Sequence, residues 1–140
     1  MIIRGAHKWF CLYEKINESL GILFAILYSD MYLSIRFLLA AQAVEALHRH
    51  LLPSTYIDET RYEEIRRELV NSIPGEVPPN LKSKLKDVLK YGNELSLRRR
   101  LKEVSQRLAE KGAADIICLD SAFISDVVDT RNYLTHYGHL

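Results

Sequence analysis

The sequence predicts an all-α protein, a bundle of five or six helices. Apolar residues recur at intervals of three and four along most of the chain, which is the spacing of one helix face. No run alternates with the period of two that a half-buried strand requires. Glycine (6) and proline (4) are scarce in 140 residues, which leaves few turns for a many-stranded fold.

The first part of the chain, from about Trp9 to Leu51, is almost continuous helix-forming sequence. A single helix of roughly forty residues is unusual in a domain of this size, so Asp30 either faces solvent or marks a break between two helices. Pro53 removes a backbone donor and ends the segment. Two apolar faces follow one another along this part: Ile16, Leu20, Leu23, Leu27 and Met31, then Leu33, Phe37, Ala40, Val44, Leu47 and Leu51.

The middle of the chain predicts two shorter helices separated by a loop. Residues 62–71 form the first, a charged segment. Residues 73–79 hold three of the four prolines and cannot be helical. Residues 81–91 predict an amphipathic helix, for which Gly92 is the candidate C-cap.

Two more helices complete the predicted bundle. Residues 93–112 predict a helix that Gly112 closes. The last helix begins at Asp120 or Ser121. Their apolar faces are Leu97, Leu101, Val104 and Leu108, and then Phe123, Val127, Thr130 and Leu134.

Length and composition are those of a single globular domain, residues 1–140. The net charge of +1 identifies no partner. Cys11 and Cys118 have apolar neighbours and no CxxC spacing, which predicts buried free thiols in a reducing compartment. The N-terminus lacks the layout of a signal peptide, and the longest apolar run is far short of the ~20 residues that cross a bilayer. We therefore expect a cytoplasmic protein.

Positive charge is concentrated in residues 81–111, which carry ten Lys or Arg against four Asp or Glu. Such a block is usually a solvated helix face. It can also be a surface that binds the phosphates of RNA. The candidate RNA-binding residues are Arg98, Arg99, Arg100 and Lys102.

Polar and titratable residues gather in DTRNYLTHYGH, residues 129–139. At 100° per residue, one stripe of the last helix carries Asp129, Asn132, Tyr133 and His136, and Arg131 lies one step around from it. A histidine that moves a proton, an arginine that clamps a phosphate and an amide that orients them are what phosphodiester cleavage needs without a metal. Alternatively, a basic residue and a histidine near a helix C-terminus simply favour the helix dipole.

A metal site has weaker support in the sequence. His48 and His50 are two residues apart and do not share a helix face. His136 and His139 form only an HxxH pair near the end of the chain. We expect neither a metal nor another cofactor.

The segment Arg131-Asn132-Tyr133-Leu134-Thr135-His136 matches the R-x(4–6)-H motif of the HEPN superfamily, and the sequence most resembles the Apea-like HEPN domains of anti-phage defence proteins. Three stretches support this resemblance, which runs from about residue 30 to the end: LLAAQAVEALHRH, YGNELSLRRRLKEV and VVDTRNYLTHYG. It implies an HEPN-like helical bundle that often forms a homodimer. Active members cut RNA without a metal in a cleft shared by two chains and leave a 2′,3′-cyclic phosphate.

Carried over by position, the resemblance makes His136 the acid/base, Arg131 the phosphate clamp and Asn132 a supporting polar residue. Asp129 and Tyr133, on the same stripe, are further supporting candidates. Glu45 also matches a family position, although a surface carboxylate paired with Arg49 at i+4 explains it equally well.

Three functions remain open at this stage. The first is a metal-independent HEPN endoribonuclease in anti-phage defence or a toxin–antitoxin system, with an antitoxin as a possible partner. The second is a non-catalytic HEPN module that binds RNA, a nucleotide or a partner protein. The third is a dimerisation domain that pairs through Phe24, Leu27, Tyr28 and Tyr32. Because Apea-like proteins usually carry a large N-terminal region, the chain is either a stand-alone HEPN protein or the C-terminal domain of a longer one.

Overall fold

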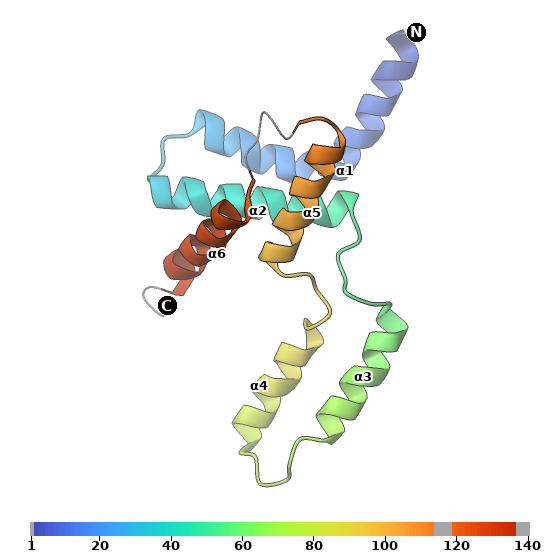
Figure 1. Ribbon diagram of the computed structural model, residues 1–140, viewed down its shortest axis with the longest axis vertical. Helices are drawn as coiled ribbons and strands as arrows, with labels where there is room; N and C mark the ends of the chain where they lie inside the picture. The colour runs from blue at the N-terminus through green and yellow to red at the C-terminus, as the bar shows by residue number, and fades with distance from the viewer. Residues whose placement is uncertain (1, 114–118, 137–140) are drawn as a thin grey trace. The chain divides into compact units, whose positions relative to one another are not determined.

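The computed structural model describes residues 2–113 and 119–136, and within these ranges the chain forms six helices and no strand (Figure 1). The all-α prediction is therefore confirmed. The helices are α1 (Ile2–Tyr28), α2 (Leu33–Leu51), α3 (Glu59–Asn71), α4 (Pro79–Lys90), α5 (Leu97–Glu110) and α6 (Ser121–His136). The chain divides into two compact units: residues up to Pro53 together with those from Ser96 on, and Ser54–Leu95. That residues 1–140 act as one HEPN-like domain stays a prediction.

The long N-terminal segment is broken where Asp30 stands. α1 ends at Tyr28 and α2 begins at Leu33, so Asp30 lies in the connection between two helices that pack side by side (Figure 1). α2 ends just before Pro53, as expected, and the Leu52 N–H donates to the carbonyl of His48 at 2.8 Å.

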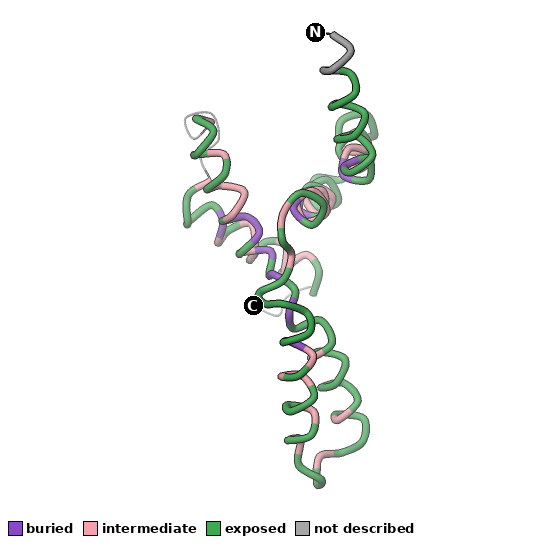
Figure 2. The backbone as a smooth tube through the Cα atoms, turned by 90° about the vertical axis from the view of Figure 1, so that its right-hand side faces the viewer, coloured by how far each residue is buried: buried purple, intermediate pink, exposed green. Residues whose placement is uncertain are grey.

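The core of the larger unit lies where α2, α5 and α6 meet. Ala41 from α2, Leu97 and Leu101 from α5 and Ile124 from α6 form one buried cluster. Val44, Val127 and Val128 pack against it. Buried residues are few, as the purple segments of Figure 2 show. The bundle is therefore held by a small apolar centre and by polar contacts around it.

Short polar signals set the ends of α5 and α6. The Ser96 hydroxyl accepts from the Arg99 N–H at 3.3 Å and caps α5. Gly112 follows α5 with a φ of 75°, the left-handed conformation that glycine adopts without a steric penalty. The Asp120 carboxylate accepts from the Phe123 N–H at 2.8 Å, which starts α6 where it was predicted to start.

The packed face of α6 differs from the predicted one. Ile124 is only 2% exposed, whereas Phe123 is 47% exposed and Thr130 is also exposed. The predicted apolar face was therefore wrong for Phe123 and Thr130 and right for the half-buried Val127 and Leu134. The face turns because α6 is packed from two sides, by α2 and by α5.

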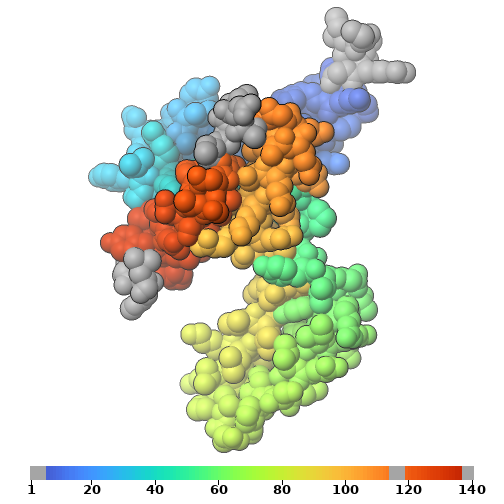
Figure 3. Space-filling view, in the orientation of Figure 1, coloured from blue at the N-terminus to red at the C-terminus, as the bar shows by residue number. Residues whose placement is uncertain are grey.

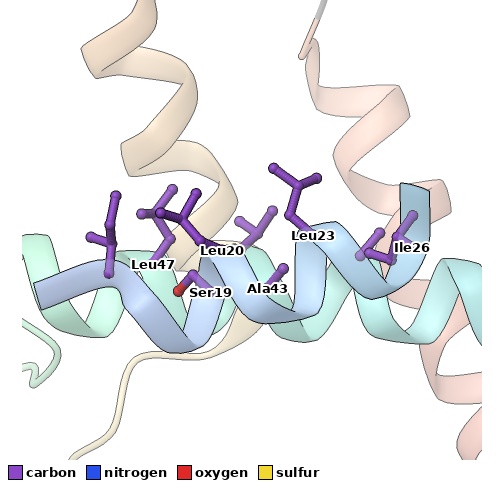
Figure 4. A pocket seen from close by; sticks show the side chains of 9 residues that line it. Ser19, Leu20, Leu23, Ile26, Ala43 and Leu47 are labelled. Atoms are coloured by element: carbon purple, nitrogen blue, oxygen red, sulfur yellow. The ribbon is translucent and has the colours of Figure 1, made fainter. Parts of the chain in front are cut away.

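α1 packs against α2 alone among the described helices. Between them lies a groove of about 290 Å³ with almost wholly apolar walls (Figure 4). Ser19 is buried in its wall, and its hydroxyl has no hydrogen-bond partner among the described residues. The outer side of α1 and the turn after it leave large side chains exposed: Trp9, Phe10, Tyr13, Phe24, Leu27, Tyr28 and Tyr32.

The smaller unit contains α3 and α4. The Asp58 carboxylate accepts from the N–H groups of Thr60 and Arg61, so α3 begins three residues before the predicted start. Tyr62 is buried and its hydroxyl donates to the Leu89 carbonyl of α4. Gly92 does not have the positive φ of a left-handed C-cap; instead, a side chain there would collide with the Tyr62 hydroxyl.

The cysteine prediction fails for Cys11, which is exposed on α1, with its Sγ 3.8 Å from Nε2 of His7. Cys11 is exposed because it precedes Ile16, the first described residue of α1 that is buried and the first that lines the groove with α2. Cys118 lies outside the described residues. None of the described helices combines the length and apolar character needed to cross a bilayer.

Candidate functional site

Arg131 and Asn132 lie together at the edge of the packed face of α6. Both are half-buried, and Nη1 of Arg131 donates to Oδ1 of Asn132 at 3.3 Å. Arg131 follows the buried Ile124 by seven residues, so the two share one line along the helix. Arg131 is therefore half-buried because it lies on the side of α6 that is packed at Ile124.

The other members of the predicted stripe lie further round α6, toward solvent. Asp129 and His136 are exposed, and Tyr133 is 49% exposed. His136 is in the last turn of the helix, where the Thr135 hydroxyl donates to the Arg131 carbonyl at 2.6 Å. The stripe thus carries the amide of the Arg131–Asn132 pair and, one turn further on, an accessible imidazole.

A side chain from α5 reaches the same edge of α6. Nη2 of Arg98 lies 3.4 Å from Oγ of Ser125 and 3.8 Å from Oδ1 of Asp129. The Ser125 hydroxyl donates to the other carboxylate oxygen of Asp129 at 3.2 Å. α5 and α6 lie side by side, so Arg98 extends the polar edge onto a second helix (Figure 3).

A polar network joins α2 to α5 below the surface. His48 is 1% exposed, and its Nε2 lies 2.9 Å from Oε2 of Glu103. Its Nδ1 lies 3.3 Å from Nη1 of Arg100, which is 2% exposed. Since a guanidinium can only donate, Nδ1 accepts and the ring proton is on Nε2, facing the carboxylate. The hydrogen bond from His48, followed by that from Arg99 at 2.9 Å, lowers the pKa of Glu103.

The predicted RNA-binding residues therefore separate into different environments. Lys102 is exposed, and Arg98 and Arg99 have exposed guanidinium groups with acidic neighbours. The prediction that Arg100 binds RNA was wrong, because its guanidinium is buried against His48 and does not face solvent. The lysines of residues 81–90 belong to α4 and the smaller unit, so the basic block is not one surface of one unit.

Glu45 lies on the packed side of α2. It is half-buried and stands between the buried Ala41 and His48, four residues after the first and three before the second. The structure does not bring it into a described contact with the stripe on α6, so its supporting role stays a prediction.

Sequence reasoning missed two groups at this centre. His48 was considered only as a metal ligand, and Ser125 was not singled out. The signal for His48 was available, because it follows Val44 and Ala41 on the buried face of α2 at the spacing of a helix. Among residues 2–113 and 119–136, no group of three or more His, Cys, Asp or Glu side chains is arranged to hold a metal ion.

The family model for Apea-like HEPN matches residues 38–140, well over half of the chain. The chain belongs to the Apea-like HEPN family. The matched part of this Apea-like HEPN protein includes Glu45, the arginines at the start of α5 and the whole of α6, whereas all of α1 and the first residues of α2 precede it. No curated protein and no solved structure matches the chain significantly.

Proposed function

We propose that this Apea-like HEPN protein is a metal-independent endoribonuclease that acts as a homodimer, with RNA bound in a cleft to which both chains contribute. One observation carries the proposal. α6 presents a half-buried Arg131–Asn132 pair and, one turn after Asn132 on the same stripe, the exposed imidazole of His136. An ordered cation and an accessible acid/base group at one end of a helix are the groups that cleavage of a phosphodiester uses.

The proposed reaction uses the ribose 2′-hydroxyl as nucleophile, which RNA supplies. A base removes the 2′-hydroxyl proton as the oxygen bonds to the adjacent phosphorus, and an acid gives a proton to the 5′-oxygen as its bond to phosphorus breaks. The products are a 2′,3′-cyclic phosphate and a 5′-hydroxyl. His136 supplies one of these proton transfers, and His136 of a second copy supplies the other.

Arg131 stabilises the negative charge that grows on the phosphate oxygens during attack. Its hydrogen bond to Asn132 and its half-buried position limit the rotamers that its long side chain can adopt. A pre-ordered guanidinium loses less entropy when it binds a phosphate, so more of the interaction is available to the transition state. Asn132 is accordingly a positioning residue for Arg131.

Cleavage of a labelled RNA in the presence of EDTA tests this proposal. Arg131→Ala and His136→Ala should each lower the rate by about 10²-fold or more, since one removes the charge clamp and the other a proton donor or acceptor. Arg36→Ala and His50→Ala remove the same side-chain types from exposed positions of α2 and serve as matched controls. Circular dichroism establishes that every variant keeps its helices.

The products give a second check. A cyclic phosphate should appear at the 3′ side of the cut, and a substrate with 2′-deoxyribose at the cleaved position should stay intact. If Arg131→Ala and His136→Ala cut RNA as fast as the parent, the assignment of the site is wrong. A parent that cuts the 2′-deoxy substrate would contradict the mechanism.

The second candidate is a non-catalytic HEPN module that binds RNA, a nucleotide or a partner protein. The side chains of Arg98, which is 41% exposed, and of the exposed Arg99 and Lys102 on α5 favour it, because they provide charge without needing His136. RNA binding that weakens with salt but leaves every RNA uncut would support this candidate over the nuclease. In either form, the family suggests a role in anti-phage defence or in a toxin–antitoxin pair.

A further inference from the structure

Arg98, Ser125 and Asp129 form a small polar ring between α5 and α6. Arg98 approaches both the Ser125 hydroxyl, at 3.4 Å, and the Asp129 carboxylate, at 3.8 Å. Ser125 donates to Asp129 at 3.2 Å and so closes the ring. The ring holds one cation and one anion, and neither group has a role in the chemistry proposed for His136.

The ring lies on the same edge of α6 as His136 and Asn132. At 100° per residue, Ser125, Asp129, Asn132 and His136 fall within about 60° of one another around the helix. Asp129 precedes His136 by seven residues, which is about 10 Å along the helix axis. Arg98 therefore lies on the same side of α6 as His136, about two helical turns before it.

The contact between Arg98 and Asp129 is easily exchanged. Its 3.8 Å is longer than the 2.7–2.9 Å that is typical of a charge-assisted hydrogen bond. The side chains remain 41% and 56% exposed, so water already competes for both. A phosphate can take two hydrogen bonds from one guanidinium, a geometry that this carboxylate does not reach.

We propose that Arg98 binds a phosphate flanking the one that is cut, and that Asp129 occupies Arg98 until the RNA displaces it. This inference rests on the proposed function, since it assigns a second contact to the same RNA. Asp129 is then a competitor of the substrate, and its charge weakens RNA binding. A purely structural Asp129, which holds Arg98 in place for RNA, would have the opposite effect.

Binding of a fluorescent 2′-O-methyl RNA to the full chain distinguishes a competing Asp129 from a purely structural one. This RNA has no free nucleophile, so it is bound without being cut. Anisotropy titrations at several salt concentrations would compare the parent with Asp129→Asn. We expect Asp129→Asn to bind about two- to fivefold more tightly, the gain from releasing an exposed ion pair. Asp126→Asn changes the net charge equally on the exposed side of α6 and is the matched control.

Arg98→Ala, alone and combined with Asp129→Asn, completes a double-mutant cycle of the two residues. It should weaken binding and lower the slope of log K against log salt by about 0.7, the value for one phosphate contact on a single strand. In the Arg98→Ala background, Asp129→Asn should have no more effect than Asp126→Asn, because the pair it releases is gone.

Weaker binding by Asp129→Asn, or an effect equal to that of Asp126→Asn, would overturn the inference, as would an unchanged salt slope for Arg98→Ala. A parent that does not bind the 2′-O-methyl RNA would overturn it together with the proposed function. A parent that binds this RNA with the expected variant effects but never cuts unmodified RNA would refute the nuclease proposal alone and leave the Arg98 contact supported.

Discussion

Arg98, Arg99 and Arg100 are consecutive in the sequence, yet their side chains have three different surroundings. Arg98 points to the polar edge of α6, Arg99 pairs with Glu103 on its own helix, and Arg100 is buried against His48 of α2. Successive residues of a helix point about 100° apart, so three neighbours sample most of its circumference. A count of charges in the sequence could not separate them, because the separation depends on which helices cover each side of α5.

Glu103 accepts from both His48 and Arg99, and this lowers its pKa. A carboxylate with a lowered folded-state pKa stabilises the fold above the ordinary glutamate pKa of about 4.3, and that contribution is lost as the pH falls through the lowered value. We expect Glu103→Gln to lower the free energy of unfolding at pH 7 by about 1 kcal/mol. We also expect the loss of stability between pH 6 and about pH 3 to be smaller in the variant than in the parent.

Urea unfolding followed by circular dichroism measures both effects. Glu110→Gln is the matched control, since Glu110 is an exposed carboxylate in the last turn of the same helix. If Glu103→Gln and Glu110→Gln had the same stability at pH 7 and the same dependence on pH, the hydrogen bonds of Glu103 to His48 and Arg99 would not stabilise the fold.

At the scale of elements, local signals predicted the helices well. Asp30 lies in the α1–α2 break, one of the two alternatives that the sequence left open. Ser121 begins α6 and Gly112 closes α5 as predicted, because each signal acts on nearby backbone. The sequence prediction was wrong where a residue distant in the sequence determines the local structure. Phe123 is exposed because α2 and α5 pack against other sides of α6. A side chain at Gly92 would collide with the hydroxyl of Tyr62, which belongs to α3. The position of Asn132 on a polar stripe, with Arg131 one step around from it, was likewise predicted from the sequence, whereas the partial burial of both was not.

Two glycines should respond to alanine with opposite signs. Gly112 has a φ of 75°, so Gly112→Ala should lower the free energy of unfolding by about 1 kcal/mol. Gly21 lies inside α1, and a Cβ there meets nothing within 4 Å, so Gly21→Ala should raise it by up to about 1 kcal/mol. Chemical denaturation of the parent and both variants measures these changes in the free energy of unfolding. A stabilising Gly112→Ala would contradict the end assigned to α5.

At the scale of the whole molecule, the chain leaves much apolar surface uncovered. Phe24, Leu27 and Tyr28 of α1 and Tyr32 after it are between 51% and 83% exposed. Large exposed apolar patches on a protein usually mark an interaction surface. No reading of a single sequence could give the geometry of such an interface, since it depends on a second molecule. The same is true of the proposed cleft, for which one chain supplies one Arg131 and one His136.

Subunit mixing tests whether that cleft is shared. Parent chains are unfolded together with an excess of His136→Ala chains and refolded. Because the proposed reaction uses His136 of both chains, a mixed dimer should be inactive, and the activity should fall with the square of the parent fraction. Mixing with His50→Ala chains, which keep the proposed site, is the control and should leave the activity of the sample unchanged. If the activity falls in simple proportion to the parent fraction although mixed dimers form, each chain acts alone and the shared cleft is refuted.

Because the three neighbouring arginines of α5 point in different directions, their surroundings depend on where the helix begins. One residue inserted after its Ser96 cap would rotate every later side chain by about 100°, turning the buried guanidinium toward water and an exposed one toward His48. The composition and net charge of the segment would hardly change. Transplanting this helix into another scaffold, or aligning it with another sequence, therefore requires the position of the cap as well as the run of arginines.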